Sequence, residues 1–172
     1  MMHYIKPVAA DVEEISSIFR ESFNNRWLSK KFSQHLISLY LKHPNLAIVA
    51  KDEDKIVGFI YAIDNISRLF KQTKLVDKIA PWRLGYFIPS KLKYANEPFV
   101  LIYFVDKDYR GQGIASNLLQ KVLDQMKSKQ KQVFMQIHLN NKSSIRVAQK
   151  HGAQKIEHGG YIKKYGIYRI DL

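Results

Sequence analysis

The chain has 172 residues, of which 46% are hydrophobic and 25% are charged, and this composition suits one globular domain with a hydrophobic core. It contains no cysteine, which excludes disulfides, thiolate metal sites and cysteine nucleophiles, and we expect a cytoplasmic protein without a metal. The formal net charge of +13 favours an anionic partner, such as a phosphate-bearing ligand, nucleic acid or an acidic membrane face. No stretch approaches the roughly 20 apolar residues that span a bilayer. Among the anionic partners we expect a small ligand and no membrane.

The first third of the chain predicts a strand, two helices and a β-hairpin. Residues 2–8 are typical of a strand, and Asp11 then begins a helix in which Glu14 has the spacing of a capping box. Ser29 begins a second helix, which Pro44 ends. The two hairpin strands are expected at 46–50 and 56–62.

Gly58, inside the second hairpin strand, indicates a bulge or a close approach of another segment to the backbone. Residues 65–97 then form the least regular part of the chain and are predicted to be an insertion. Apolar residues between 66 and 76 suggest an amphipathic helix within it. Its aromatic side chains either pack on the core or form a lid over a substrate.

The second half of the chain alternates strands and helices. An apolar run at 99–105 predicts a buried strand, and a helix of about four turns follows at 114–126. Another buried strand is expected at 133–139. Asn141 is a candidate N-cap for a helix that ends before Gly152, which has the position of a left-handed residue. The last twenty residues predict two strands.

This order of elements predicts an α/β protein, more narrowly an α+β arrangement with one central mixed, mostly antiparallel sheet flanked by helices on both faces. No linker divides the chain, so residues 1–172 are expected to form a single domain that carries the insertion at about 65–97.

The segment 105–115 leaves a buried strand and opens an amphipathic helix. The first N–H groups of a helix have no intrahelical acceptor, and the helix dipole adds a partial positive charge. Gly111 and Gly113 would let this backbone approach an anion closely, since no Cβ intervenes. The sequence therefore predicts a phosphate-binding loop. It lacks the lysine of a P-loop and the third glycine of a Rossmann fingerprint.

The pattern Arg-x-x-Gly-x-Ala at 110–115 resembles the acetyl-CoA loop of the GNAT superfamily of N-acetyltransferases, usually Gln/Arg-x-x-Gly-x-Gly/Ala. Asn141, Ala148 and Gly152 are similar in spacing to a later helix of that family, and the element order also matches. The resemblance covers nearly the whole chain outside the insertion. It implies a GNAT-like single domain that moves an acetyl group from acetyl-CoA, as co-substrate, to a primary amine.

The resemblance also implies roles for individual residues. The amides of the loop would hold the cofactor pyrophosphate, the backbone of the preceding strand would pair with the pantetheine arm, and the later helix start would contact that arm. The implied cofactor-binding residues are Phe104, Val105, Arg110, Gly111, Gln112, Gly113, Ile114, Ala115, Asn141 and Ser144. The loop between the first two helices would contact the acceptor through Asn24, Arg26 and Trp27.

The general acid and the general base are open. Many members of the family protonate the leaving thiolate with a tyrosine at the position of Ala148, and alanine cannot donate a proton. Tyr165 or Tyr168 could supply a donor from a neighbouring strand, or solvent could protonate the thiolate. Candidate bases are Tyr103 and His138, and a relay of water molecules is an equal alternative.

The acceptor amine is not named by any motif, but the net charge favours an anionic small molecule or a protein amine over a polyamine. Two alternative hypotheses remain: a regulatory domain that binds acetyl-CoA without turnover, and a basic nucleic-acid-associated protein. Nucleic acid is not the expected partner, since the cations form no stripe or known motif in the sequence. A homodimer, if it forms, is expected to use the insertion or the terminal strands.

Overall fold

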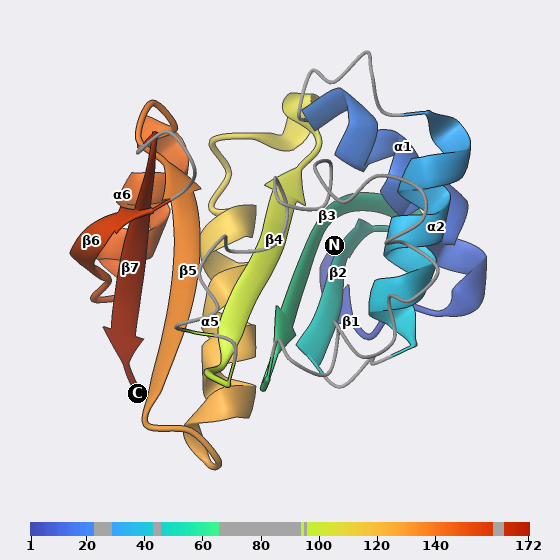
Figure 1. Ribbon diagram of the computed structural model, residues 1–172. Coiled ribbons are helices and arrows are strands. Elements are labelled where there is room, and N and C mark those ends of the chain that lie inside the picture. Colours follow the sequence, from blue (N-terminus) through green and yellow to red (C-terminus); the bar gives the residue numbers. More distant parts are fainter. Residues whose placement is uncertain (23–28, 43–45, 66–93, 95, 160–163) are drawn as a thin grey trace. The chain divides into compact units, whose positions relative to one another are not determined.

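The computed structural model describes residues 1–22, 29–42, 46–65, 94, 96–159 and 164–172 (Figure 1). The helices are α1 (Val12–Ser22), α2 (Lys30–Leu41), α5 (Ile114–Lys127) and α6 (Lys142–Lys150), with short 3₁₀ turns η1 (Ala9–Asp11) and η5 (Lys107–Tyr109). The strands are β1 (Met2–Ile5), β2 (Ala47–Asp52), β3 (Lys55–Ile63), β4 (Phe99–Val105), β5 (Gln132–His138), β6 (Gln154–Gly159) and β7 (Tyr165–Asp171). The predicted helix within the insertion lies outside the described residues.

The strands follow the order β1-β2-β3-β4-β5-β7-β6 in one mixed sheet. β4 and β5 are parallel, whereas β1 with β2, β2 with β3, β5 with β7 and β6 with β7 are antiparallel. This confirms the predicted mixed, mostly antiparallel sheet. The chain divides into two compact units, Met1–Tyr61 with Tyr103–Gln125, and Ala62–Ile102 with Met126–Leu172. The residues of β4 are shared between these units.

In the first unit, Gly58 of β3 lies directly beneath α5. A Cβ atom at this position would lie 3.1 Å from Leu118 Cδ1 and 3.2 Å from Ile114 Cγ2. The β2–β3 register also shifts beside Gly58: Ala50 pairs with Gly58, but the next residue, Lys51, pairs with Ile56, so Val57 has no partner residue in the register. The sequence offered a bulge or a close approach, and both are present.

The opposite face of the same sheet carries α1 and α2. Phe59, next to Gly58 and therefore on the other face, has its ring centroid 5.5 Å from that of Phe104, which lies 5.8 Å from the ring of Phe19 in α1. Tyr40 of α2 stacks on Tyr61 of β3 at 4.5 Å. Helices therefore cover both faces of the sheet in this unit, as the sequence predicts.

The predicted capping box at the start of α1 is wrong. The Asp11 carboxylate instead accepts a hydrogen bond from the Val8 N–H at 2.8 Å and pairs with Lys51 Nζ at 2.9 Å. Glu14 accepts a hydrogen bond from the Ile56 N–H at 2.9 Å. Both carboxylates therefore tie the helix start to the hairpin. β1 ends earlier than expected, because the chain at Val8 already enters the turn η1.

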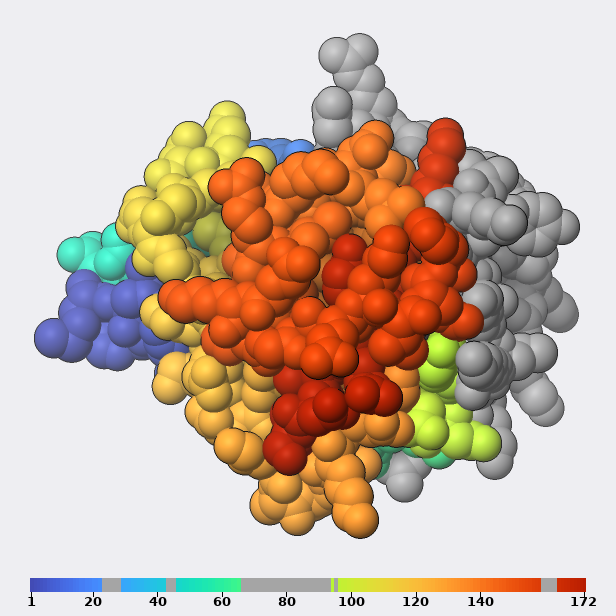
Figure 2. Space-filling model, turned by 90° about the vertical axis from the view of Figure 1, so that its left-hand side faces the viewer, coloured from blue at the N-terminus to red at the C-terminus, as the bar shows by residue number. Residues whose placement is uncertain are grey.

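In the second unit, β5 lies between β4 and β7, and Phe99 pairs with Phe134 across the parallel ladder. Gly152 follows α6 with φ of +82°, which confirms the predicted left-handed residue. Figure 2 views the side of the molecule on which α6 and β6 (orange to red) form the surface. No helix in the described part of the chain is long and apolar enough to cross a membrane.

Candidate functional site

The loop between β4 and α5 begins with a compact turn. Asp106 Oδ1 accepts a hydrogen bond from the Asp108 N–H at 3.1 Å, and the Tyr109 N–H donates to the Asp106 carbonyl at 3.0 Å. Gly111 and Gly113 then adopt φ of +82° and +79°, a region that other residues rarely enter. Both are exposed, and a Cβ at either would meet no atom within 4 Å. The two glycines therefore allow a backbone conformation that other residues rarely adopt, and they leave the space beside the loop open.

The backbone amides of residues 111–115 donate to no acceptor among the described residues. The first hydrogen bond of the helix region runs from the Asn117 N–H to the Gly113 carbonyl at 3.0 Å. A row of unsatisfied amides at the start of a 14-residue helix, with the positive end of its dipole, is suited to a phosphate group. The loop that the sequence singled out thus has the geometry of an anion site.

Phe104 and Val105 contribute differently. The Phe104 ring is buried in the core, so only its backbone can serve a ligand. The Val105 carbonyl accepts a hydrogen bond from Arg110 Nε at 3.2 Å, which holds the exposed Arg110 side chain back against the end of the strand. Gln112 is exposed, whereas Ile114 is buried beneath the loop.

Sequence reasoning missed Lys55, the first residue of β3. Its ammonium lies 3.3 Å from Asp106 Oδ2 and 4.9 Å from the centroid of the Tyr109 ring. Because Lys55 is remote from the loop in sequence, only the fold brings them together. No local motif carries that signal.

Asn141 and Ser144 lie at the start of α6 in the second unit. Asn141 Oδ1 accepts a hydrogen bond from the Ser144 N–H at 3.0 Å, which confirms the predicted N-cap. The cap uses the amide oxygen and leaves the amide NH₂ as a donor. Ala148, farther along the helix, is fully buried, so it brings no functional group to any surface.

His138 and Tyr103 have different surroundings. His138 Nδ1 accepts a hydrogen bond from the Asn140 N–H at 3.1 Å. A neutral imidazole bonded in this way carries its proton on Nε2, so that nitrogen is a donor rather than a base. Tyr103 is half-buried in β4.

The two candidate tyrosines of β7 lie on opposite faces. Tyr165 pairs with His138 across the β5–β7 ladder, and their rings meet edge to face at 5.1 Å. Tyr168 pairs with Met135, three residues back along β5, and its ring covers Gly166, where a Cβ would lie 2.8 Å from Tyr168 Cε2. Burial raises the pKa of Tyr168. Only Tyr165 shares a face with His138.

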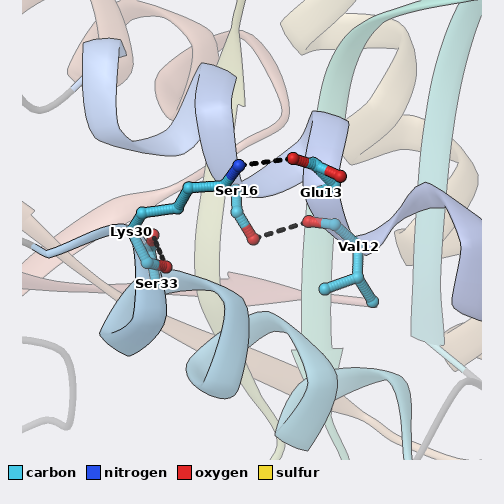
Figure 3. Close-up of polar contacts among 5 residues, drawn as sticks. All are labelled: Val12, Glu13, Ser16, Lys30 and Ser33. Carbon is cyan, nitrogen blue, oxygen red and sulfur yellow. Dashed lines mark hydrogen bonds and ion pairs between the residues drawn. The ribbon is translucent and has the colours of Figure 1, made fainter.

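The residues predicted to contact the acceptor, Asn24, Arg26 and Trp27, lie outside the described residues. Figure 3 shows one ion pair between the helices on either side of them and one serine hydrogen bond within each helix. Lys30 at the start of α2 pairs with Glu13 of α1, and Ser33 Oγ donates to the Lys30 carbonyl at 2.9 Å. Ser16, nearly fully buried, donates to the Val12 carbonyl.

Residues 12–153 match the family model described as "Acetyltransferase (GNAT) family". A comparison with curated proteins gives no match. Similar solved structures include PH1933 from Pyrococcus horikoshii, with a TM-score of 0.74 and 18% identity over 100% of this chain and 99% of that one. Another is yncA from Salmonella typhimurium with acetyl-CoA, at TM-score 0.69 and 15% identity, covering 99% and 94%. A third is diaminobutyrate acetyltransferase from Paenibacillus lautus with its substrate and coenzyme A, at TM-score 0.65 and 16% identity, covering 99% and 95%.

Proposed function

Because the chain belongs to the GNAT acetyltransferase family, whose co-substrate is acetyl-CoA, we propose that it transfers the acetyl group directly to a primary amine. The observation that carries this is the row of unsatisfied amides at 111–115 with its two left-handed glycines. These amides would bind the pyrophosphate, and the backbone at Phe104 and Val105 would pair with the pantetheine arm. Asn141 and Ser144 would contact the same arm. Residues 1–172 would act as one acetyltransferase domain.

The reaction needs two proton transfers. The ammonium of the acceptor must lose a proton before its nitrogen attacks the thioester carbonyl, and the departing thiolate must gain one when the C–S bond breaks. Tyr103 or a relay of water molecules would accept the first proton. His138 could accept it through Nδ1, but only after that nitrogen released the Asn140 N–H, and its ring neighbour Tyr165 suits it equally to an orienting role. Tyr165 would donate to the thiolate in place of the tyrosine that Ala148 replaces.

The acceptor is proposed to be an anionic amine, either a small molecule or a protein amine. The net charge of +13 disfavours cationic acceptors such as polyamines. Solved neighbours include a diaminobutyrate acetyltransferase and a ribosomal-protein-alanine N-acetyltransferase from Brucella melitensis. Proteins of similar fold are thus named for a small-molecule amine and for a protein amine. Competition between amines for acetyl-CoA turnover tests this class. Preferred turnover of spermidine would overturn it.

The first experiment is thermal unfolding with acetyl-CoA, coenzyme A, NAD and ATP added separately. A ligand at one hundred times its dissociation constant stabilises a protein by about 2.7 kcal/mol, which is readily measured. Stabilisation by both coenzyme A forms, without NAD or ATP, is expected. If neither coenzyme A form shifts the transition, the loop is only a glycine-rich helix start. Release of free thiol with a panel of amines then separates an enzyme from a domain that binds acetyl-CoA without turnover.

A further inference from the structure

Lys55 stands where the β2–β3 hairpin meets the turn that precedes the loop amides. It follows a hairpin turn in which Glu53 has φ of +53°, and its side chain is 51% exposed. Its ammonium contacts both sides of η5, with 3.3 Å to Oδ2 of the N-cap residue Asp106 and 4.9 Å to the ring of Tyr109, the last residue of η5. One cation therefore makes an ion pair with the residue that caps the turn and a cation–π contact with the last residue of the turn.

Asp106 connects this cation to the backbone of the turn. Its side chain is only 13% exposed, and its two oxygens have separate partners: Oδ2 faces Lys55, while Oδ1 accepts the Asp108 N–H. The Asp106 N–H donates to the Val57 carbonyl of β3 at 2.9 Å. The turn is thus attached to β3 by a backbone hydrogen bond and an ion pair. The hydrogen bond to Asp106 raises the pKa of Lys55 and so favours the charged ammonium further.

The segment after this turn is held at its start by the Arg110 hydrogen bond to the Val105 carbonyl and at its end by the buried Ile114. Gly111 and Gly113 are exposed and lack side chains, and the amides at 111–115 make no hydrogen bond within the described residues. Glycine backbones lose the most conformational freedom on ordering, so a ligand that binds such a loop has to supply that ordering free energy unless the loop is already fixed at its entry.

We propose that Lys55 is a positioning residue for acetyl-CoA: through Asp106 and Tyr109 it fixes the turn that aims the amides of 111–115 at the cofactor phosphates. This rests on the proposed function, in which those amides bind the pyrophosphate. An exposed ion pair adds little to the global stability of a protein. Its effect is therefore expected in cofactor binding rather than in folding.

The test compares Lys55→Met with Lys55→Arg and with Lys121→Met. Lys121 lies over the ring of Tyr4, 5.4 Å from its centroid, so Lys121→Met removes the same charge and the same type of contact away from the turn. We expect Lys55→Met to raise KM and the dissociation constant for acetyl-CoA about three- to tenfold with kcat unchanged. Lys55→Arg should restore most of the affinity, and Lys121→Met should leave it intact.

Asp106→Asn separates positioning from direct contact with the phosphates. If Lys55 acts through Asp106, Asp106→Asn weakens binding as Lys55→Met does, and the double variant is no worse than either single variant. Additive losses, or unweakened binding in Asp106→Asn, would mean that Lys55 touches the cofactor itself, and the proposal would fail. Equal affinity of Lys55→Met and the parent protein would also overturn it. Absence of coenzyme A binding in the parent protein would instead contradict the proposed function.

Discussion

At the scale of single residues, the left-handed glycines give the sharpest prediction. In Gly113→Ala, the backbone at φ of +79° costs about 1 kcal/mol, and a methyl group enters the space proposed for the phosphate. We expect KM for acetyl-CoA to rise more than tenfold while kcat at saturation is largely kept, because the substitution removes binding rather than chemistry. Steady-state kinetics with varied acetyl-CoA measure this.

Gly152 provides the matched control. It has φ of +82°, and a Cβ there would also meet no atom within 4 Å, but it ends α6 rather than opening the loop. Gly152→Ala should therefore lower the unfolding temperature about as much as Gly113→Ala does and leave KM unchanged. If both variants raised KM alike, backbone strain rather than phosphate binding would explain the effect.

The tyrosine pair of β7 gives a second prediction at this scale. Tyr165→Phe should lower kcat about a hundredfold, the size expected for loss of a general acid, with KM for acetyl-CoA unchanged. Tyr168→Phe should leave kcat unchanged, because Tyr168 lies on the other face of the strand. Single-turnover measurements with a good acceptor separate chemistry from product release. Full activity in Tyr165→Phe would assign the thiolate proton to solvent.

At the scale of elements, the sequence predicted what depends on neighbours along the chain. Ser29 caps α2 and Asn141 caps α6, each through a residue three positions on. Asp11 and Glu14 have the same spacing, yet both bind the hairpin: Asp11 pairs with Lys51, and Glu14 accepts the Ile56 N–H. The choice between Tyr165 and Tyr168 likewise needed the β5–β7 register. Long-range pairing is what local spacing cannot supply.

The contact between α2 and β3 predicts a pH dependence. Burial raises the pKa of Tyr40, with the stacked Tyr61 adding to the shift, so the unfolded chain ionises first as the pH rises past about 10. The stability due to neutral Tyr40 is thus complete below pH 10 and lost above it. The free energy of unfolding should fall less between pH 9 and 11 in Tyr40→Phe than in the parent. Denaturant titrations measure this, with the partly exposed Tyr4→Phe as control; parallel losses in all three proteins would contradict it.

At the scale of the whole molecule, composition alone indicated a positive net charge and, from it, an anionic ligand. There are 28 lysines and arginines against 15 acidic residues. Asp11, Glu13 and Asp106 each pair with one lysine, and such pairs leave the net charge of the chain unchanged. A field of this sign raises the local concentration of a polyanionic cofactor and speeds its association. Composition could not indicate a place for the anion; the glycine pattern of the sequence and the left-handed backbone at Gly111 and Gly113 are what support the proposed loop.

That field predicts a salt dependence specific to the phosphates. Raising the ionic strength from about 0.05 to 0.5 M shortens the screening length from above 10 Å to a few ångströms, so KM for acetyl-CoA should rise several-fold with kcat unchanged. Acetyl-pantetheine, which keeps the thioester but lacks the nucleotide phosphates, is the matched substrate and should show almost no salt dependence. An equal rise for both substrates would place the effect on the protein or the acceptor instead.

Steep loss of DNA binding over the same range, without cofactor, would favour a nucleic-acid partner for the positive surface.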